Sequence, residues 1–491
     1  MPSGLEASGG GRLSELAARN GGWLGLAAVV AILLLGLGLR LDYAIDGRPP
    51  VYDAKAYARI AAHLEEGDGF TAGRRATQPS SNYSPGLPLL VAGIYALTGG
   101  VDGELARIVL AALASLAVLF SYLLGRRLGG VVGRRAGVIA GLIGAAAVAI
   151  YPALLEYGGM LMSEPLAATL LAGGVLALLW AGDAGRGGEA RASGDTGRAG
   201  EARGATWWRW LLAGAVLGAL SLVRPEYLAV SFLLALLVLL RGVAGLTKDD
   251  HAARGLGFWR SLGAAALVCV GIVVVVGPWT MRNAIALDRF VPISTGGGQV
   301  LFAGSYLPSG GDPERVGTEV VERHPELFAP KAVKELRLEQ ILARLAHSRY
   351  PELETDEALA RMGRERLGDA LSEEPLEYAG FLAAKVARVW SHGPRGIMRD
   401  ELWEALHWVL IGLGLVGLAV LLWKRRWEAL LIAAVFLAVT AVSAVLVASP
   451  RRVLVMVPLI AACAGFGAVW LDAQSFRLGA PSQQGSGRPP G

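Results

Sequence analysis

Long, uninterrupted apolar runs constrain this chain more than any other feature of its sequence. A helix of roughly 20 residues, rising 1.5 Å per residue, crosses the hydrocarbon layer of a bilayer. Runs near that length cover residues 22–40, 105–124, 136–155, 165–180, 210–223, 227–240, 262–279, 402–423, 427–447 and 453–471. Only 18% of residues are charged and 54% are hydrophobic, whereas soluble domains have about a quarter charged. The sequence predicts an all-α polytopic membrane protein with about ten transmembrane helices.

One further apolar run, residues 85–98, is short for a span and contains two prolines. If this run crossed the bilayer, the segment GRRLGGVVGRR at 125–135, with its four arginines, would lie outside. Loops rich in Lys and Arg favour the cytoplasmic side. The run is therefore predicted to be a juxtamembrane or re-entrant helix at the outer surface.

The same charge rule orders the rest of the chain. It predicts a cytoplasmic segment 1–21, a transmembrane module 22–300 with a first outer loop 41–104, a disordered cytoplasmic linker 182–209, an extracytoplasmic helical region 301–401, transmembrane helices 402–472 and a disordered tail 473–491. The linker and tail are low in complexity and cannot form a core. The predicted location is the cell (plasma) membrane.

A few basic residues break the charge rule, because they are predicted near the outer ends of spans. They are Arg224, Arg282, Lys385, Arg388, Arg451 and Arg452. Such side chains either extend to the interface and pair with carboxylates or converge on one outer cavity. In the second case their forked guanidinium groups would suit phosphate oxygens.

Outer acidic residues accompany these cations. Asp53 precedes a helix whose apolar stripe contains Tyr57, and it acts either as a helix cap or as a functional carboxylate. Glu164, in GGMLMSEPLAA, opens the next inward span, where the preceding serine is the competing cap. Glu156 is a third candidate.

Several classes of function lack their motifs here. The glycines of STGGGQVLFAGSY are not followed by the Lys-Ser/Thr of a phosphate-binding loop. No HExxH, Cys-x-x-Cys or EF-hand pattern occurs. Basic residues lie in short loops that membrane orientation explains, so no nucleic-acid partner is expected. The chemistry is expected to use a substrate reached from the outer leaflet.

Several stretches, in this order, resemble the membrane-embedded C-type glycosyltransferases (GT-C), in particular the bacterial relatives of protein O-mannosyltransferases and the lipid A aminoarabinose transferase. They are VYDAKAY with the GDGF exit, YSPGLPLLVAGIYALTGG, YLLGRRLGG, MLMSEPLAA, LVRPEY, PWTMRN with FVPISTGGG, and SPRRVLVMVPL. Together they extend over most of residues 22–470.

The resemblance implies a sugar transferred from a polyprenyl phosphate carrier to a protein, lipid or glycan acceptor at the outer face. It makes Asp53 the general base and Glu164 the second acidic residue. The substrate-binding residues are then Tyr57, Tyr83, Arg224, Arg282, Lys385, Arg451 and Arg452. A base on the far side of the sugar from the leaving phosphate implies inversion.

Two departures from the family pattern bear on cofactors. The adjacent acidic pair is here Asp53-Ala54, and Tyr83-Ser84-Pro85 occupies the place of a Glu-Lys-Pro found in some relatives. No cofactor is therefore expected, although a divalent metal stays open. Three different functions compete with sugar transfer from a polyprenyl phosphate: a secondary transporter, a scaffold without activity, and a glycan ligase that uses a carrier diphosphate.

Overall fold

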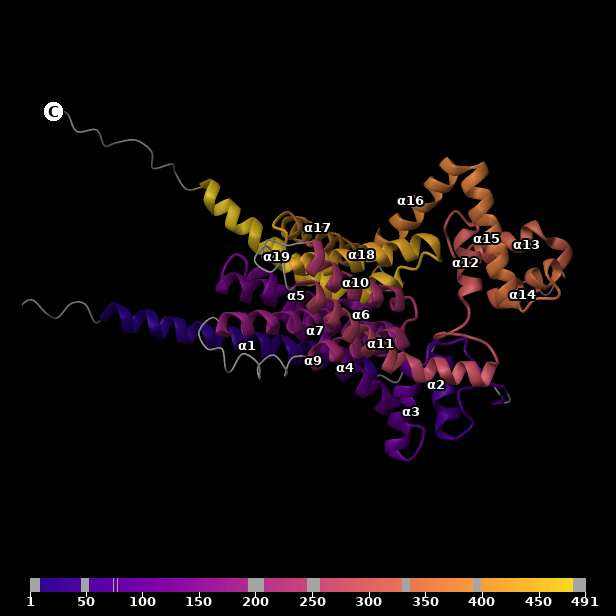
Figure 1. Cartoon of the computed structure of the whole chain (residues 1–491), viewed down its shortest axis with the longest axis horizontal. Helices are drawn as coiled ribbons and strands as arrows, with labels where there is room; N and C mark the ends of the chain where they lie inside the picture. Colours follow the sequence, from indigo (N-terminus) through magenta and orange to yellow (C-terminus); the bar gives the residue numbers. More distant parts are fainter. Residues whose placement is uncertain are drawn as a thin grey trace, which may run out of the picture.

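The computed structural model describes residues 9–45, 53–73, 75–76, 78–192, 207–244, 257–328, 336–391, 398 and 400–479. Within these ranges every regular element is a helix and none is a strand, which confirms the all-α prediction. Long helices form an elongated bundle, and a group of shorter helices lies at one of its ends (Figure 1).

The bundle accounts for all the predicted spans. Its helices are α1 (Gly9–Ile45), α4 (Gly103–Gly129), α5 (Arg134–Ile150), α6 (Pro152–Gly158), α7 (Ser163–Ala192), α9 (Trp207–Val223), α10 (Tyr227–Ala244), α11 (Gly257–Leu287), α17 (Glu401–Trp423), α18 (Trp427–Val445) and α19 (Arg451–Gly479). Of the helices described, seven are long and apolar enough to cross a membrane. The pair α5 and α6, bent by 52°, makes an eighth candidate, whereas α9 and α10 are apolar but shorter.

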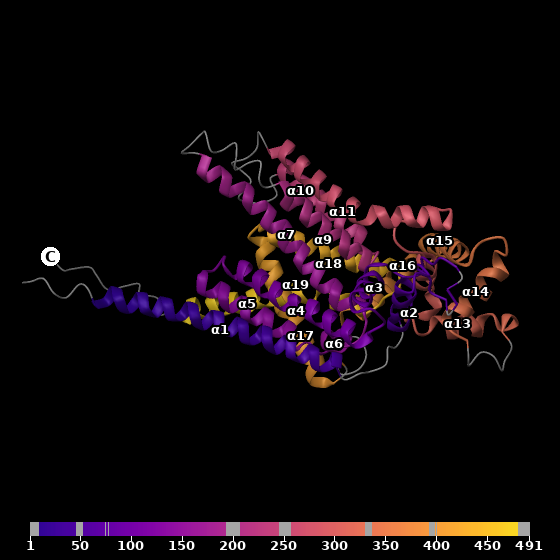
Figure 2. The same ribbon diagram turned by 90° about the horizontal axis from the view of Figure 1, so that it is seen from below.

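The short apolar run after the first span forms its own 13-residue helix, α3 (Gly86–Thr98). It packs on α2 (Asp53–Glu65), and both lie at the end of the bundle that also carries the shorter helices (Figure 2). A helix of 13 residues is too short to cross a bilayer. The prediction of a juxtamembrane helix is therefore supported.

The shorter helices form a cap. They are α12 (Gly297–Ser305), α13 (Val316–Arg323), α14 (Leu338–Arg349), α15 (Thr355–Glu373) and α16 (Pro375–Ser391). Phe302, Val316, Leu342 and Leu359 are buried in a core of the cap, against which Val447 of the bundle also packs. The cap therefore has its own packing and rests on the bundle through α12 and α16.

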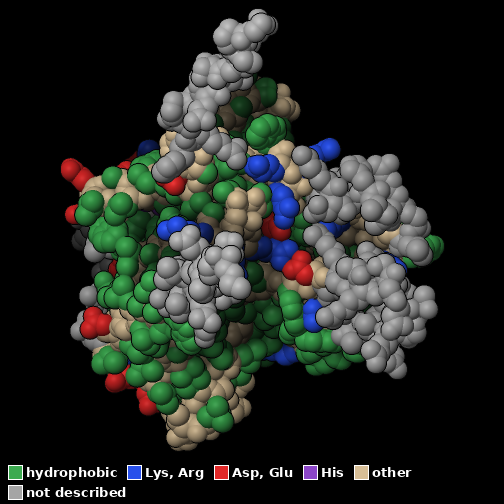
Figure 3. Space-filling model, turned by 90° about the vertical axis from the view of Figure 1, so that its left-hand side faces the viewer, with side chains coloured by type: hydrophobic (Ala, Val, Ile, Leu, Met, Phe, Trp, Pro, Cys, Tyr) green, Lys and Arg blue, Asp and Glu red, His purple; other side chains and the backbone are tan. Residues whose placement is uncertain are grey.

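The opposite end of the bundle is basic. Figure 3 looks onto this end, and Lys and Arg side chains gather near its middle with hydrophobic side chains around them. Arg127 of α4 pairs with Asp183 of α7 and, at 2.9 Å, with Glu428 of α18. The segments predicted to share the cytoplasmic side are thus in contact with one another.

Two segments that were predicted to be disordered are helical where the structure describes them. Helix α7 continues to Ala192, beyond position 182 where the linker was placed, and residues 193–206 lie outside the described ranges. Helix α19 likewise continues to Gly479, and the tail from 480 onward lies outside them. A helix can continue past the bilayer because its backbone hydrogen bonds are internal.

Helix α19 lies at the centre of the bundle. Of the residues in its apolar 18-residue stretch, 89% are buried. It crosses α17 at very short range. A Cβ atom on Gly417 would lie 2.1 Å from the carbonyl oxygen of Cys463, so only glycine allows these backbones to meet, as is common between membrane helices. This packing fixes the first turn of α19, which begins with Arg451.

A buried arginine stabilises the bend between α5 and α6. Arg40 of α1 is 1% exposed and donates hydrogen bonds to the carbonyl oxygens of Val148 and Ala149, at 3.0 and 3.3 Å. These carbonyls end α5, where no following turn supplies N–H partners, and a helix C-terminus favours a cation. The bend directs α6, with Tyr157, toward the first turn of α19.

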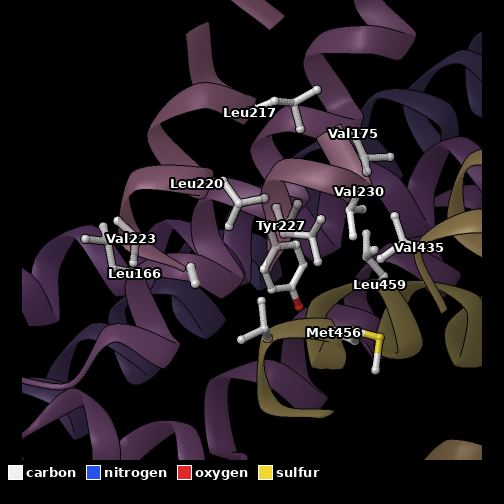
Figure 4. Close-up of a cluster of buried hydrophobic side chains, with 14 of the residues drawn as sticks. Leu166, Val175, Leu217, Leu220, Val223, Tyr227, Val230, Val435, Met456 and Leu459 are labelled. Atoms are coloured by element: carbon white, nitrogen blue, oxygen red, sulfur yellow. The ribbon is translucent and has the colours of Figure 1, made fainter. Parts of the chain in front are cut away.

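An apolar cluster supports the turn at residues 224–226, between α9 and α10. Figure 4 shows the ring of Tyr227 surrounded by Leu217, Leu220 and Val223 of α9, Leu166 and Val175 of α7, Val435 of α18, and Met456 and Leu459 of α19. Four helices therefore hold this turn and the start of α19 against each other.

Candidate active site

Five separate segments of the chain meet in one cleft at the cap end. They are the start of α2, the loop before α3, the first turn of α7, the turn at 224–226 and the first turn of α19. The cleft has a volume of about 120 Å³ and is lined by Asp53, Tyr57, Ser84, Ser163, Glu164, Val223, Arg224, Pro225, Glu226 and Arg451. The candidate base, the second acid and two of the rule-breaking arginines therefore come together.

Arg451 joins the two predicted acids. Its Nη1 lies 2.9 Å from Oδ2 of Asp53 and 3.8 Å from Oε1 of Glu164. The Asp53 side chain is 46% exposed, whereas that of Glu164 is 2% exposed. Asp53 thus lies at the mouth of the cleft, in contact with solvent, and Glu164 forms its buried wall.

Arg224 forms the base of the cleft. Its guanidinium group lies 3.2 Å from Oε1 of Glu164, 2.9 Å from Oε1 of Glu226 and 3.3 Å from the hydroxyl of Ser163. The other oxygen of Glu164, Oε2, is buried and has no hydrogen-bond partner among the described residues. Unpaired buried acceptors are uncommon in folded proteins.

Tyr57 of α2 lines the cleft, and Tyr83 of the following loop packs against it. The ring of Tyr57 lies 5.8 Å from that of Tyr83, edge to face. Burial raises the pKa of Tyr57, and the charges of Asp53 and Glu164 act in the same direction. Tyr57 therefore stays protonated and can donate a hydrogen bond. The predicted burial of the Tyr57 face of α2 is confirmed.

Three of the predicted substrate-binding cations lie elsewhere and contact backbone carbonyls. Arg282 donates hydrogen bonds to the carbonyls of Ser80 and Phe70. Lys385 is buried and donates to those of Gly304 and Ala444. Burial lowers the pKa of Lys385 to about 7, and Arg452 acts in the same direction.

Arg452, next to the cleft residue Arg451, is not among the residues that line the cleft. It donates to the carbonyl of Val447, at the end of α18, and its Nε lies 3.9 Å from Glu226. Arg388 pairs with Asp312 at 2.8 Å. The contacts of these cations therefore indicate that they bind groups of the protein rather than a substrate.

Sequence reasoning missed two contributors to the site. Glu226 was not among the predicted site residues, and Ser163 was considered only as a competing helix cap. One signal for Glu226 was present in the sequence. Glu226 follows the candidate Arg224 by two positions in LVRPEY, so its carboxylate was a possible partner for that arginine. Glu156, the third acidic candidate, is not among the residues that line the cleft.

The carboxylates of the cleft do not fit a divalent metal site. Asp53, Glu164 and Glu226 each lie within 4 Å of a guanidinium nitrogen, and the described ranges hold no group of three or more His, Cys, Asp or Glu suited to a metal ion. A cation would have to replace these arginine contacts. No step of the mechanism below passes through a metal.

The Glu226 carboxyl makes the stability of the cleft depend on pH. Burial acts to raise its pKa, but Arg224 and Arg452 outweigh this and hold the pKa below its ordinary value of 4.5. Its stabilising contribution is therefore fully present above pH 4.5 and is lost as the pH falls through the lowered pKa. We expect the wild type to melt at a higher temperature than Glu226→Gln above pH 4.5. This difference should become smaller as the pH falls below 4.5. A difference that stays constant with pH would contradict this assignment.

Comparison with known proteins identifies the fold. No family model and no curated protein sequence matches the chain. Among solved structures it is similar to the oligosaccharyltransferase AglB from Archaeoglobus fulgidus in complex with an inhibitory peptide and a dolichol-phosphate, with 15% identity, a TM-score of 0.52, and coverage of 95% of this chain and 52% of that one. The apo form of the A. fulgidus oligosaccharyltransferase gives 15% identity, a TM-score of 0.52, and coverage of 94% and 53%.

ArnT from Cupriavidus metallidurans bound to undecaprenyl phosphate also matches, with 16% identity, a TM-score of 0.38, and coverage of 95% of this chain and 81% of that one. The chain spans about half the length of the oligosaccharyltransferase structures. It has the GT-C fold, as the ordered stretches of its sequence predicted.

Proposed function

We propose that this protein is a glycosyltransferase that moves a sugar from a polyprenyl phosphate to an acceptor hydroxyl, with inversion at the anomeric carbon. The carrying observation is the solvent-exposed carboxylate of Asp53 held 2.9 Å from the Arg451 guanidinium, at the mouth of a cleft with buried Glu164 behind it. The GT-C fold supports the proposal, and so does the dolichol-phosphate bound in the similar AglB structure.

The reaction needs a base and a stabilised leaving group. In the proposed step the Asp53 carboxylate takes the proton of the acceptor hydroxyl, whose oxygen forms a bond to the anomeric carbon. The bond from that carbon to the phosphate oxygen breaks, and its electron pair leaves with the polyprenyl phosphate. Arg451 would donate hydrogen bonds to that phosphate, because fixed guanidinium groups in a water-poor site stabilise developing charge.

The buried network gives the cleft a fixed geometry. Glu164 and Glu226 hold Arg224 from two sides, so this cation does not have to reorganise when a phosphate binds. Arg451 pairs with Asp53 in the structure. A phosphate that binds Arg451 would compete for this pairing and leave the carboxylate available as a base. Donor binding and base activation are thereby coupled.

We place this site on the outer face of the plasma membrane. Helix α2, which contributes Asp53 to the cleft, lies at the cap end of the bundle (Figure 2). The basic end that Figure 3 shows is the opposite one, and loops rich in Lys and Arg favour the cytoplasm. The polyprenyl chain would lie against the lipid-facing helices, and the acceptor would approach from the cap side.

Binding of undecaprenyl phosphate to the purified protein in nanodiscs tests the proposal. We expect Arg451→Ala to bind this lipid about 10- to 100-fold more weakly, since a hydrogen bond to a charged group contributes about 1.5–3 kcal/mol. The matched control is Arg315→Ala, which removes an arginine whose side chain is 60% exposed on the cap. Equal affinity of the wild type and the Arg451 variant would reject the proposed phosphate contact.

A further inference from the structure

A second hollow lies beside the cleft and has no place in the mechanism above. Its volume is about 280 Å³. The loop after α2 and the end of α11 form it, and its polar lining includes Arg75, Gln78, Ser80, Asn82 and Arg289. We call it the loop hollow. It is larger than the cleft, so it has room for a saccharide unit.

The described residues of the loop at both sides of the hollow form hydrogen bonds to three other segments. Arg282 donates to the carbonyl of Ser80 at 2.9 Å, and Arg59 donates to that of Ala72 at 3.1 Å. The backbone N–H of Thr295 donates to the carbonyl of Ser81 at 2.8 Å, and its hydroxyl donates to Oδ1 of Asn82 at 2.8 Å. The hollow is therefore preformed, which lowers the entropic cost of binding.

The charge of the loop hollow is positive. Arg75 and Arg289 contribute to its lining, and no Asp or Glu lines it among the described residues. Arg289 is paired with Glu354 at the edge of the cap, whereas Arg59 and Arg282 lie against the backbone of the same loop. Guanidinium groups suit phosphate or carboxylate oxygens. The amides of Gln78 and Asn82 suit sugar hydroxyls, because they both donate and accept hydrogen bonds.

The loop hollow and the cleft share a wall. Asn82 lines the hollow and Ser84 lines the cleft, and since consecutive Cα atoms are about 3.8 Å apart, these two residues lie within about 7 Å of each other. Tyr83, between them, packs its ring against Tyr57 of the cleft. A ligand in the hollow can therefore extend one hydroxyl past Tyr83 toward Asp53.

We propose that the loop hollow binds the acceptor, and that the acceptor is a sugar that carries a phosphate or carboxylate group. The acceptor role of the loop hollow rests on the proposed glycosyl transfer. Binding of an anionic sugar in the hollow is a separate claim, because this binding does not require Asp53 or Arg451.

Ligand-observed NMR titrations on the full-length protein in nanodiscs test the inference. The probes are glucose 6-phosphate and glucuronate, with glucose and inorganic phosphate as controls. We expect both anionic sugars to bind more tightly than either control and to compete with each other. Arg75→Glu should weaken their binding at least about tenfold, whereas Arg315→Glu on the cap should leave it unchanged. Competition by phosphatidylinositol in the nanodisc would indicate a lipid headgroup as the source of such a sugar.

Undecaprenyl phosphate binding is measured on the same samples and separates the two proposals. If this lipid binds but anionic sugars bind no better than glucose, or bind equally well to Arg75→Glu, the inference is wrong and the proposed function stands. If inorganic phosphate matches glucose 6-phosphate, the hollow recognises only an anion and the inference is also wrong. Sugar binding without binding of the lipid would retain the hollow and reject the proposed donor.

Discussion

An Asp53→Asn variant is expected to transfer sugar about 10²- to 10⁴-fold more slowly than the wild type, the contribution of a positioned general base. Asparagine has nearly the shape of aspartate and keeps an oxygen that accepts a hydrogen bond from Arg451. It cannot accept the proton of the acceptor hydroxyl. The measurement is the movement of label from polyprenyl phosphate sugars to any acceptor in membranes that contain each variant.

The fold should survive this change. The Asp53 side chain is 46% exposed, and exposed ion pairs contribute only about 0–1 kcal/mol. A matched control is Asp68→Asn, the same substitution at an exposed position of the loop after α2. The control is expected to transfer sugar at the wild-type rate. Full activity in the Asp53 variant, with unchanged expression, would remove the base from the mechanism and favour the transporter or the scaffold.

The sequence predicted much of this architecture because its signals are physical requirements of a bilayer. A span needs an apolar run, and the arginines of 125–135 fix which way the chain crosses. That reasoning separated α3 from the spans, and it placed Asp53, Glu164, Arg224 and Arg451 at one end. The structure brings these four residues into one cleft.

The reasoning failed where the partner of a charge is a backbone group. Lys385 and Arg452 were predicted near the outer ends of spans. In the structure they donate hydrogen bonds to the carbonyls of Ala444 and Val447, in the last turn of α18 and just after it. A helix C-terminus and a phosphate both attract a cation. Sequence patterns give the side of the membrane, but they do not give the distances that decide between these partners.

The loop hollow was not predicted for a related reason. Residues 71–82 have neither a helical nor an alternating pattern, so their conformation depends on distant partners. Arg282 and Thr295, more than 200 positions later, hold this loop through its backbone carbonyls. Contacts of this kind leave no periodic signal in the sequence.

An Arg224→Ala variant is expected to lose about 3–5 kcal/mol of stability, the cost of removing one partner from a buried ion pair. Its side chain is 14% exposed and lies between Glu164 and Glu226, whose side chains are 2% and 17% exposed. Without the guanidinium group, two carboxylates would face each other in a poorly solvated site. The melting temperature of the purified protein in detergent measures the loss.

Two comparisons separate this electrostatic cost from a simple loss of packing. Arg361→Ala removes an arginine whose side chain is 52% exposed and pairs with Glu365, so it should change stability by no more than about 1 kcal/mol. A triple variant, Arg224→Met with Glu164→Gln and Glu226→Gln, removes the arginine together with both carboxylates and should recover part of the stability. The recovery should be incomplete, because Arg452 loses its contact with Glu226 and keeps only its hydrogen bond to the carbonyl of Val447. The triple variant should not recover sugar transfer, since the fixed cation and the second acid of the cleft are both gone. If the triple variant is no more stable than Arg224→Ala, the network stabilises the cleft by packing alone, and its charges have to be explained by substrate binding.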